Sequence, residues 1–127
     1  MKDNITNFSV NEDGLTYIKN GEYTSWSKRS LEKVKKNIKK VDYECLELIK
    51  GGDIYEFNYK EENDDYKKHI GFVIGNKYKT PSKILNDKKD GIDYDSATSI
   101  LWKAVQEQQV QIEKLQKELE EKINGKN

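Results

Sequence analysis

Few side chains in this 127-residue sequence could carry chemistry. Cys45 is the only cysteine and His69 is the only histidine, so the sequence has no cluster with metal-ligand spacing, and we expect neither a metal nor a cofactor. Cys45 lies in a helical pattern, where a small buried residue is a better interpretation than a nucleophile. Ser30 directly precedes a run with helical spacing, which is a common place for an N-cap serine. Lys35 follows five residues later, in a segment that is dense in lysine.

Composition excludes several classes of function. Lysine plus arginine and aspartate plus glutamate both number 23, so the net charge is zero and nothing favours binding to nucleic acid or to an anionic membrane. No run approaches the roughly 20 apolar residues that a membrane span needs. Aliphatic residues are few for a chain of this size, and a small polar domain of this kind gains stability from partners.

The C-terminal run over residues 90–122 carries the longest pattern. Two sets of residues recur at heptad spacing, Thr98, Val105, Ile112 and Leu119 in one and Leu101, Gln108, Leu115 and Lys122 in the other. This spacing places a narrow apolar stripe along one long helix, as in a coiled coil. Asp95 or Ser96 can serve as the N-cap, and Gly125 lies just past the end.

Two interpretations of this stripe are open. The helix could dock on its own domain, or it could associate with the same helix of other copies. We favour self-association as a homotrimer, because the rest of the chain is small and polar. Gln108, at an inward-facing position, fits this role, since a buried polar layer selects register and strand number at some cost in stability. The alternative is that Gln108 is simply a tolerated exposed residue.

The rest of the chain predicts short elements. Residues 1–25 alternate imperfectly between apolar and polar residues and contain two hairpin signals, Asp13-Gly14 and Asn20-Gly21. We therefore expect strands from the end of a β-rich shaft, and we expect this chain to be the end of a longer architecture. The three- and four-residue spacing from Leu31 to Val41 predicts a helix, and a second short helix holds Cys45 and ends at Gly51-Gly52.

Two strands are expected next, over residues 53–60 and 69–75, the second apolar on both faces and therefore central. The predicted fold is α+β, with a β segment over residues 1–25, a small mixed body over residues 26–94 and a long coiled-coil-type helix over residues 95–124.

Four segments between Trp26 and Lys122 together resemble one family, the C-terminal intramolecular chaperone, or auto-processing, domain of phage tail spikes, tail fibres and neck appendages. The matching motifs are Ser30 with Lys35-Lys36-Asn37-Ile38, then Phe57-x-Tyr59, then His69-Ile70-Gly71-Phe72, and finally Gly91-Ile92-x-Tyr94 with Lys103-Ala104-x-Gln106-Glu107. None is specific alone, but their order and separation are those of the family.

The resemblance implies a domain that trimerises at the end of a fibre protein, holds three chains in register and helps the upstream shaft of the same polypeptide to fold. In many members the domain then cuts itself off before a serine that works with a lysine five residues later. Aligned on the family, these residues are Ser30 and Lys35, and the bond cut is Arg29–Ser30. His69 occupies the family's histidine position, where it could orient the reacting loop or stabilise charge. The alternative is a hydrogen-bonded structural residue beside a strand. Leu31 departs from the family, which often has an acidic residue there.

The chemistry that this implies is nucleophilic. The Ser30 hydroxyl would attack the carbonyl carbon of Arg29, with Lys35 as the general base. A lysine normally titrates near ~10.4, so burial or neighbouring cations must lower that value before it can accept a proton at neutral pH. Whether the domain acts as such a single-turnover endopeptidase is left open by the sequence.

The resemblance also implies location and partners: host cytoplasm during assembly, and the virion tail if the domain is retained. An alternative function is a retained adhesion or receptor-binding tip that does not cut itself. In that case Tyr55, Tyr59 and Tyr66 could stack on sugars of a bacterial surface receptor.

Overall fold

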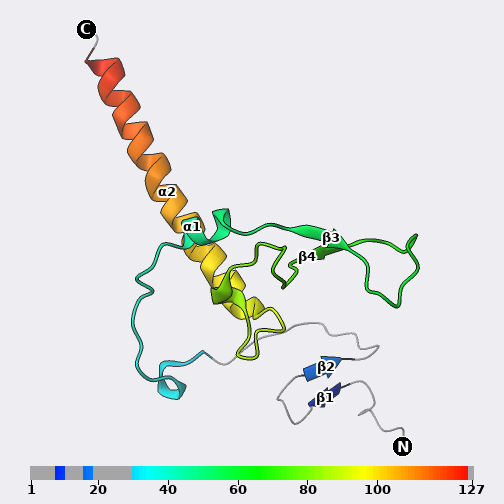
Figure 1. Ribbon diagram of the computed structural model, residues 1–127. Helices are drawn as coiled ribbons and strands as arrows, with labels where there is room; N and C mark the ends of the chain where they lie inside the picture. The colour runs from blue at the N-terminus through cyan, green and yellow to red at the C-terminus, as the bar shows by residue number, and fades with distance from the viewer. Residues whose placement is uncertain (1–7, 11–15, 19–29, 126–127) are drawn as a thin grey trace, which may run out of the picture. The chain divides into compact units, whose positions relative to one another are not determined.

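The computed structural model describes residues 8–10, 16–18 and 30–125 of a chain that divides into two compact units, Met1–Lys40 and Val41–Asn127 (Figure 1). In the first unit, strands β1 (Phe8–Val10) and β2 (Thr16–Ile18) pair antiparallel. This hairpin is the first one that the sequence predicts. The Asp13-Gly14 turn and the strand expected after Asn20-Gly21 lie outside the described residues.

The helix predicted from Leu31 to Val41 is wrong. Only a single 3-10 turn forms, η1 (Glu32–Val34), and Lys35 after it is already extended. Asn37 has a φ of 56°, a left-handed conformation that interrupts any helix and that asparagine tolerates better than most residues. The apolar residues of the pattern are all exposed. A helix of this length is marginal in water unless its apolar face packs against something, and none of the residues that the structure describes covers this face.

The second unit is built around two helices, α1 (Cys45–Lys50) and the long α2 (Tyr94–Asn124), which pack against each other. The turn η2 (Ser82–Ile84) also contacts α2. The small core consists of Cys45, Ile84, Ile100 and Ala104. Cys45 is buried, as its helical pattern predicted, and Gly51 ends α1 as expected.

The sheet of this unit has two antiparallel strands, β3 (Tyr55–Phe57) and β4 (His69–Gly71), with Glu56 opposite Ile70. Both strands were predicted, but the central position of the second was not correct. Among the described residues β4 pairs with β3 alone, and Ile70 is 72% exposed. The run over residues 69–75 is apolar for another reason. Phe72 lies beyond the end of β4 and packs against the helical core.

Helix α2 (Tyr94–Asn124) has its N-cap two residues before Asp95, the earlier of the two predicted caps. Asp93 is the N-cap, and its carboxylate accepts hydrogen bonds from the backbone N–H of Ser96 at 3.2 Å and from the Ser96 hydroxyl at 2.8 Å. Asp95 and Ser96 therefore belong to the first turn and are not the cap. Gly125 closes the helix at the predicted place.

Candidate functional site

Helix α2 has two apolar faces, of which one is buried and the other is exposed. Ile100 and Ala104 are buried in the core of their own unit, whereas Leu101 and Val105, one residue further along, are exposed. One residue step turns the helix by about 100°, so these two pairs define two adjacent stripes. The helix therefore docks on its own unit through one stripe and leaves the heptad stripe uncovered. We call this second stripe the seam, and it contains Leu101, Val105, Gln108, Ile112, Leu115 and Leu119.

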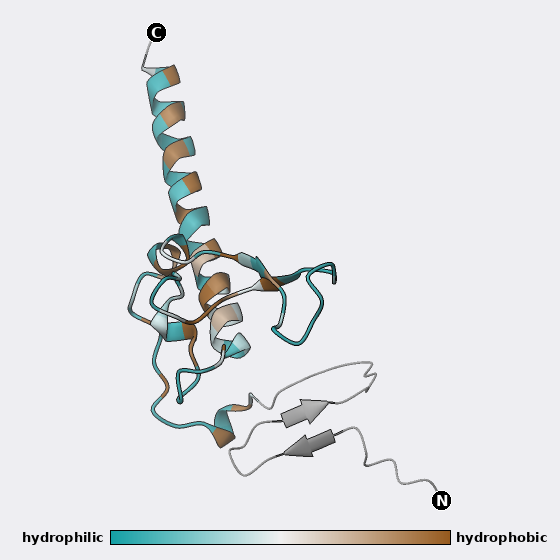
Figure 2. Cartoon of the chain, turned by 45° about the vertical axis from the view of Figure 1, so that its right-hand side comes forward, coloured by the Kyte–Doolittle hydropathy of each residue, from teal (hydrophilic) through white to brown (hydrophobic). Residues whose placement is uncertain are grey.

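The seam continues well past the body of the unit. Every residue from 108 to 125 is exposed, and the five apolar seam residues are between 43% and 64% exposed. Figure 2 shows apolar residues recurring along one side of this projecting part of α2. Gln108 is exposed as well, in line with the apolar residues before and after it. The projecting part of α2 therefore leaves its apolar residues uncovered in the single chain.

Polar contacts of Lys103 and Glu107, which we call the latch, fix where α2 meets α1. The Glu107 carboxylate accepts hydrogen bonds from the backbone N–H of Cys45 at 2.9 Å and of Leu46 at 3.3 Å, at the N-terminal end of α1. Lys103 donates to the Tyr43 carbonyl at 2.9 Å and pairs with Glu107 at 3.2 Å. Desolvation alone would raise the pKa of the Glu107 carboxyl, but these donors outweigh it and the pKa lies below its ordinary value.

The latch was not foreseen as a contact. Its signal was present in the Lys103-Ala104-x-Gln106-Glu107 motif that carries the family resemblance. Ala104 is fully buried between the two latch residues, so three positions of this motif serve the docking of α2 on α1.

The predicted nucleophile and base are in direct contact. Lys35 Nζ donates a hydrogen bond to Ser30 Oγ at 2.5 Å. The η1 turn brings them together, because the backbone N–H groups of Val34 and Lys35 bond to the carbonyls of Leu31 and Glu32 and shorten the path between the two side chains. At this distance a neutral lysine can accept the serine proton. Both residues are exposed.

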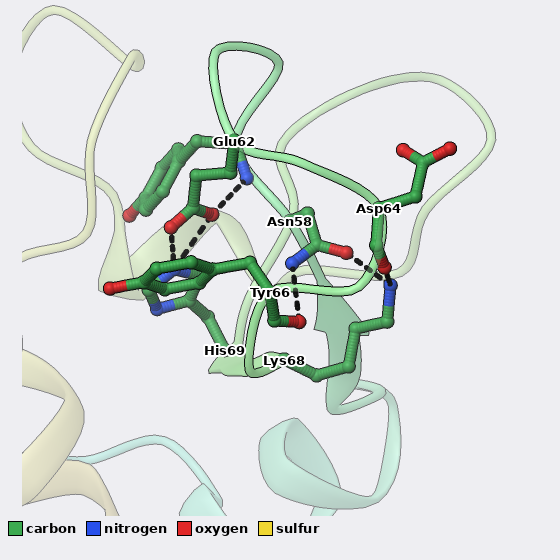
Figure 3. A network of polar contacts seen from close by, with 7 residues as sticks. Asn58, Glu62, Asp64, Tyr66, Lys68 and His69 are labelled. Atoms are coloured by element: carbon green, nitrogen blue, oxygen red, sulfur yellow. Dashed lines mark hydrogen bonds and ion pairs between the residues drawn. The ribbon is translucent and has the colours of Figure 1, made fainter.

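His69 lies in the second unit, in a cluster of rings on the β3–β4 sheet (Figure 3). Its Nε2 contacts the Glu62 carboxylate at 2.9 Å. The ring stacks with those of Phe57 and Tyr66, at centroid distances of 5.6 Å and 6.1 Å, and lies 4.8 Å from that of Tyr59. The hydrogen bond from His69 is the main cause that holds the pKa of Glu62 below its ordinary value.

The same contacts close the loop between β3 and β4. Glu62 also accepts a 2.7 Å hydrogen bond from the backbone N–H of Tyr59. Asn58 donates to the Tyr66 carbonyl at 3.2 Å and accepts from Lys68, across the base of the loop in Figure 3. Seen within its own unit, His69 therefore has the surroundings of a residue that orders this loop. Ser30 and Lys35 belong to the other unit.

The described part of the chain has neither a group of metal ligands nor a membrane-spanning helix. No group of three or more histidine, cysteine, aspartate or glutamate residues there could hold a metal ion. None of the helices in that part has the length and apolarity that crossing a bilayer requires.

Residues 30–74 match the model of a protein family described as chaperone of endosialidase, which confirms the resemblance drawn from the motifs. The matched segment starts at Ser30 and includes Lys35, η1, α1, both strands of the second sheet and His69, while α2 lies beyond it. No curated protein and no solved structure matches the chain.

Proposed function

We propose that this chain is the C-terminal intramolecular chaperone of a phage tail fibre or tail spike protein, because residues 30–74 match the model of the chaperone-of-endosialidase family. In this proposal three copies associate through the seam and align the upstream shaft for folding. The observation that carries the proposal is the division of α2 into a docked stripe and an uncovered seam. A helix that served only its own unit would not need the second stripe.

The physical benefit is entropic. Strands that pair between separate chains begin without local contacts, so the cost of closing and aligning them is large. Joining three chains at one end turns the later pairing steps into intramolecular ones at a high effective concentration. Gln108 supports correct alignment, because a polar layer inside the seam is best satisfied when the three glutamines lie at the same level.

The association state of the purified chain tests this proposal. Sedimentation equilibrium and light scattering at micromolar concentration should give three times the chain mass of 14.9 kDa. A stable monomer over this concentration range would refute the proposal. In a longer polypeptide, truncation after Asp90 should leave the upstream shaft insoluble, because the chains then lack α2.

We also propose self-cleavage before Ser30, supported by the contact between Ser30 and Lys35. Lys35 takes the hydroxyl proton as Ser30 Oγ attacks the Arg29 carbonyl carbon. The Arg29–Ser30 peptide C–N bond breaks, the amine of Ser30 takes up the proton, and an ester joins the Arg29 acyl group to Ser30 Oγ. Water then hydrolyses the ester and leaves a free Arg29 carboxylate and a new N-terminus at Ser30. His69 is proposed to orient the reacting loop in the assembled protein.

A second candidate function is a retained receptor-binding tip. It is favoured by one observation, the gathering of the exposed rings of Tyr59 and Tyr66 around His69 on a loop held by its own hydrogen bonds. Exposed aromatic rings can stack on sugar faces. Binding of the isolated domain to host cells, lost on changing both tyrosines to alanine, would favour this function. The chaperone acts in the host cytoplasm during assembly, whereas a retained tip remains in the virion.

A further inference from the structure

Trp102 is an unusual residue to leave in water. It is 71% exposed, although it is the largest apolar side chain of α2. With Leu101 and Val105 it lines an apolar hollow of about 700 Å³ beside the seam. Large aromatic side chains dominate the energetics of protein interfaces, and tryptophan is among the residues most often found at their centres.

A second apolar hollow, of about 400 Å³, lies on the other side of the seam, between α1 and α2. Its walls include Leu48 and Ile49 of α1, Ile54 before β3, and Leu101. Leu101 lines both hollows, so the two meet at the seam. Ile54 is 61% exposed at the rim. Each copy therefore carries an exposed indole on one side of the seam and an open apolar groove on the other.

Heptad geometry relates these two features in neighbouring copies. With Thr98 at position a and Leu101 at position d, Trp102 occupies position e, and Ala97 occupies the position g five residues earlier. In a parallel coiled coil, position e of one helix faces this preceding position g of the next helix. Ala97 packs against the core of its own copy and lines the groove. A neighbouring Trp102 therefore meets the groove.

We propose that Trp102 of each copy inserts into the groove between α1 and α2 of the next copy, around the threefold axis. This inference rests on the trimer proposed above. It adds a second contact between neighbouring copies to the association of their α2 helices. A buried aromatic residue contributes about 150–250 Å² of contact, a substantial part of the roughly 800 Å² that each partner supplies in a standard interface. The Trp102 contact buries apolar area in the part of the seam that the polar Gln108 interrupts.

Intrinsic fluorescence tests the proposal directly. The chain has two tryptophans, so Trp26→Phe leaves Trp102 as the only indole. In this variant of the full chain, sedimentation gives the trimer fraction over a dilution series, and the emission maximum and acrylamide quenching are read at the same concentrations. The emission of Trp102 should shift to shorter wavelength, and quenching should fall, in step with the trimer fraction.

Variants then identify the groove as the site of insertion. Trp102→Ala and Ile54→Glu should each weaken the trimer at least about tenfold, and the double variant should be little worse than either. Ile70→Glu is the matched control, because Ile70 is similarly exposed but lines neither hollow, and it should leave association unchanged. Ile54 and Trp102 are exposed in the single chain, so neither change should impair its folding.

The outcomes separate the two proposals. A trimer in which Trp102 keeps a solvent-exposed spectrum overturns the insertion and leaves the trimer standing. A trimer weakened by Trp102→Ala but not by Ile54→Glu also overturns insertion into this groove. A chain that stays monomeric overturns both.

Discussion

Glu107 of α2 closes the N-terminal end of α1 by accepting a 2.9 Å hydrogen bond from the backbone N–H of Cys45, 62 residues earlier in the chain. The residue before α1, Glu44, makes no side-chain cap of its own. The short helix thus depends on a carboxylate that tertiary folding delivers. This contact ties the base of the projecting helix to the body and sets the direction in which the seam points.

The first prediction concerns this contact. Glu107→Gln should lower the midpoint of urea unfolding, because an amide is a weaker acceptor than a carboxylate for the N–H groups at the start of α1 and loses the pairing with Lys103. Glu120→Gln, a similar change on the exposed part of α2, is the control and should leave the midpoint unchanged. Equal midpoints for both variants would show that the latch adds no stability.

Stability should also depend on pH. The pKa values of Glu62 and Glu107 both lie below the ordinary value of 4.5, so each carboxylate stabilises the fold above that pH and loses this contribution as the pH falls through its lowered pKa. Urea unfolding at pH 7 and at stepwise lower pH should show this acid-side loss. In Glu62→Gln the loss should be smaller, since the amide does not titrate. An unchanged acid profile in that variant would contradict the assignment of His69 as the partner of Glu62.

The docked stripe of α2 should matter for the stability of the single chain. Ile100→Ala should destabilise the second unit by about 2–5 kcal/mol, because it removes a buried side chain and leaves a cavity. Ile112→Ala lies on the seam, where the side chain is exposed, and should cost less than about 0.5 kcal/mol in a monomeric state. Chemical denaturation at concentrations too low for association measures both.

The seam should matter for association instead. Val105→Asp should abolish the trimer at micromolar concentration, because three carboxylates would be forced into an apolar layer. Val110→Asp is a closely matched control, since Val110 is 65% exposed on the same helix but lies off the seam. Light scattering of the two variants should give a monomer and a trimer, respectively. Two trimers would exclude the seam as the contact surface.

Self-cleavage should require both members of the proposed dyad. In a longer polypeptide that includes the upstream shaft, intact mass should reveal a product beginning at Ser30, and Ser30→Ala and Lys35→Ala should each reduce it below detection. Lys36→Ala changes the adjacent lysine and should preserve cleavage. Full-length chain alone, under conditions where the trimer forms, would remove the peptidase step and leave the chaperone proposal intact.

Local patterns sufficed for several parts of the fold. The β1–β2 pair, α1 with its Gly51 end, the presence of β3 and β4 and the C-terminal limit of α2 all follow from alternation, helical spacing and glycine placement. The heptad spacing identified the seam residues, and the family motifs singled out Ser30 and Lys35. These features depend on residues close together in the sequence, or on spacing along one element.

Contacts between distant segments decided the rest. The residues from Leu31 to Val41 have helical spacing but form only one 3-10 turn, since their apolar side chains are exposed. Helix α2 carries two apolar stripes, and sequence periodicity alone does not reveal which of them the body covers. The tertiary structure covers the stripe of Ile100 and Ala104, because Cys45 and Ile84 lie against it, and leaves the seam exposed. Periodicity fixes where apolar groups lie on an element, whereas burial depends on which other surface reaches them.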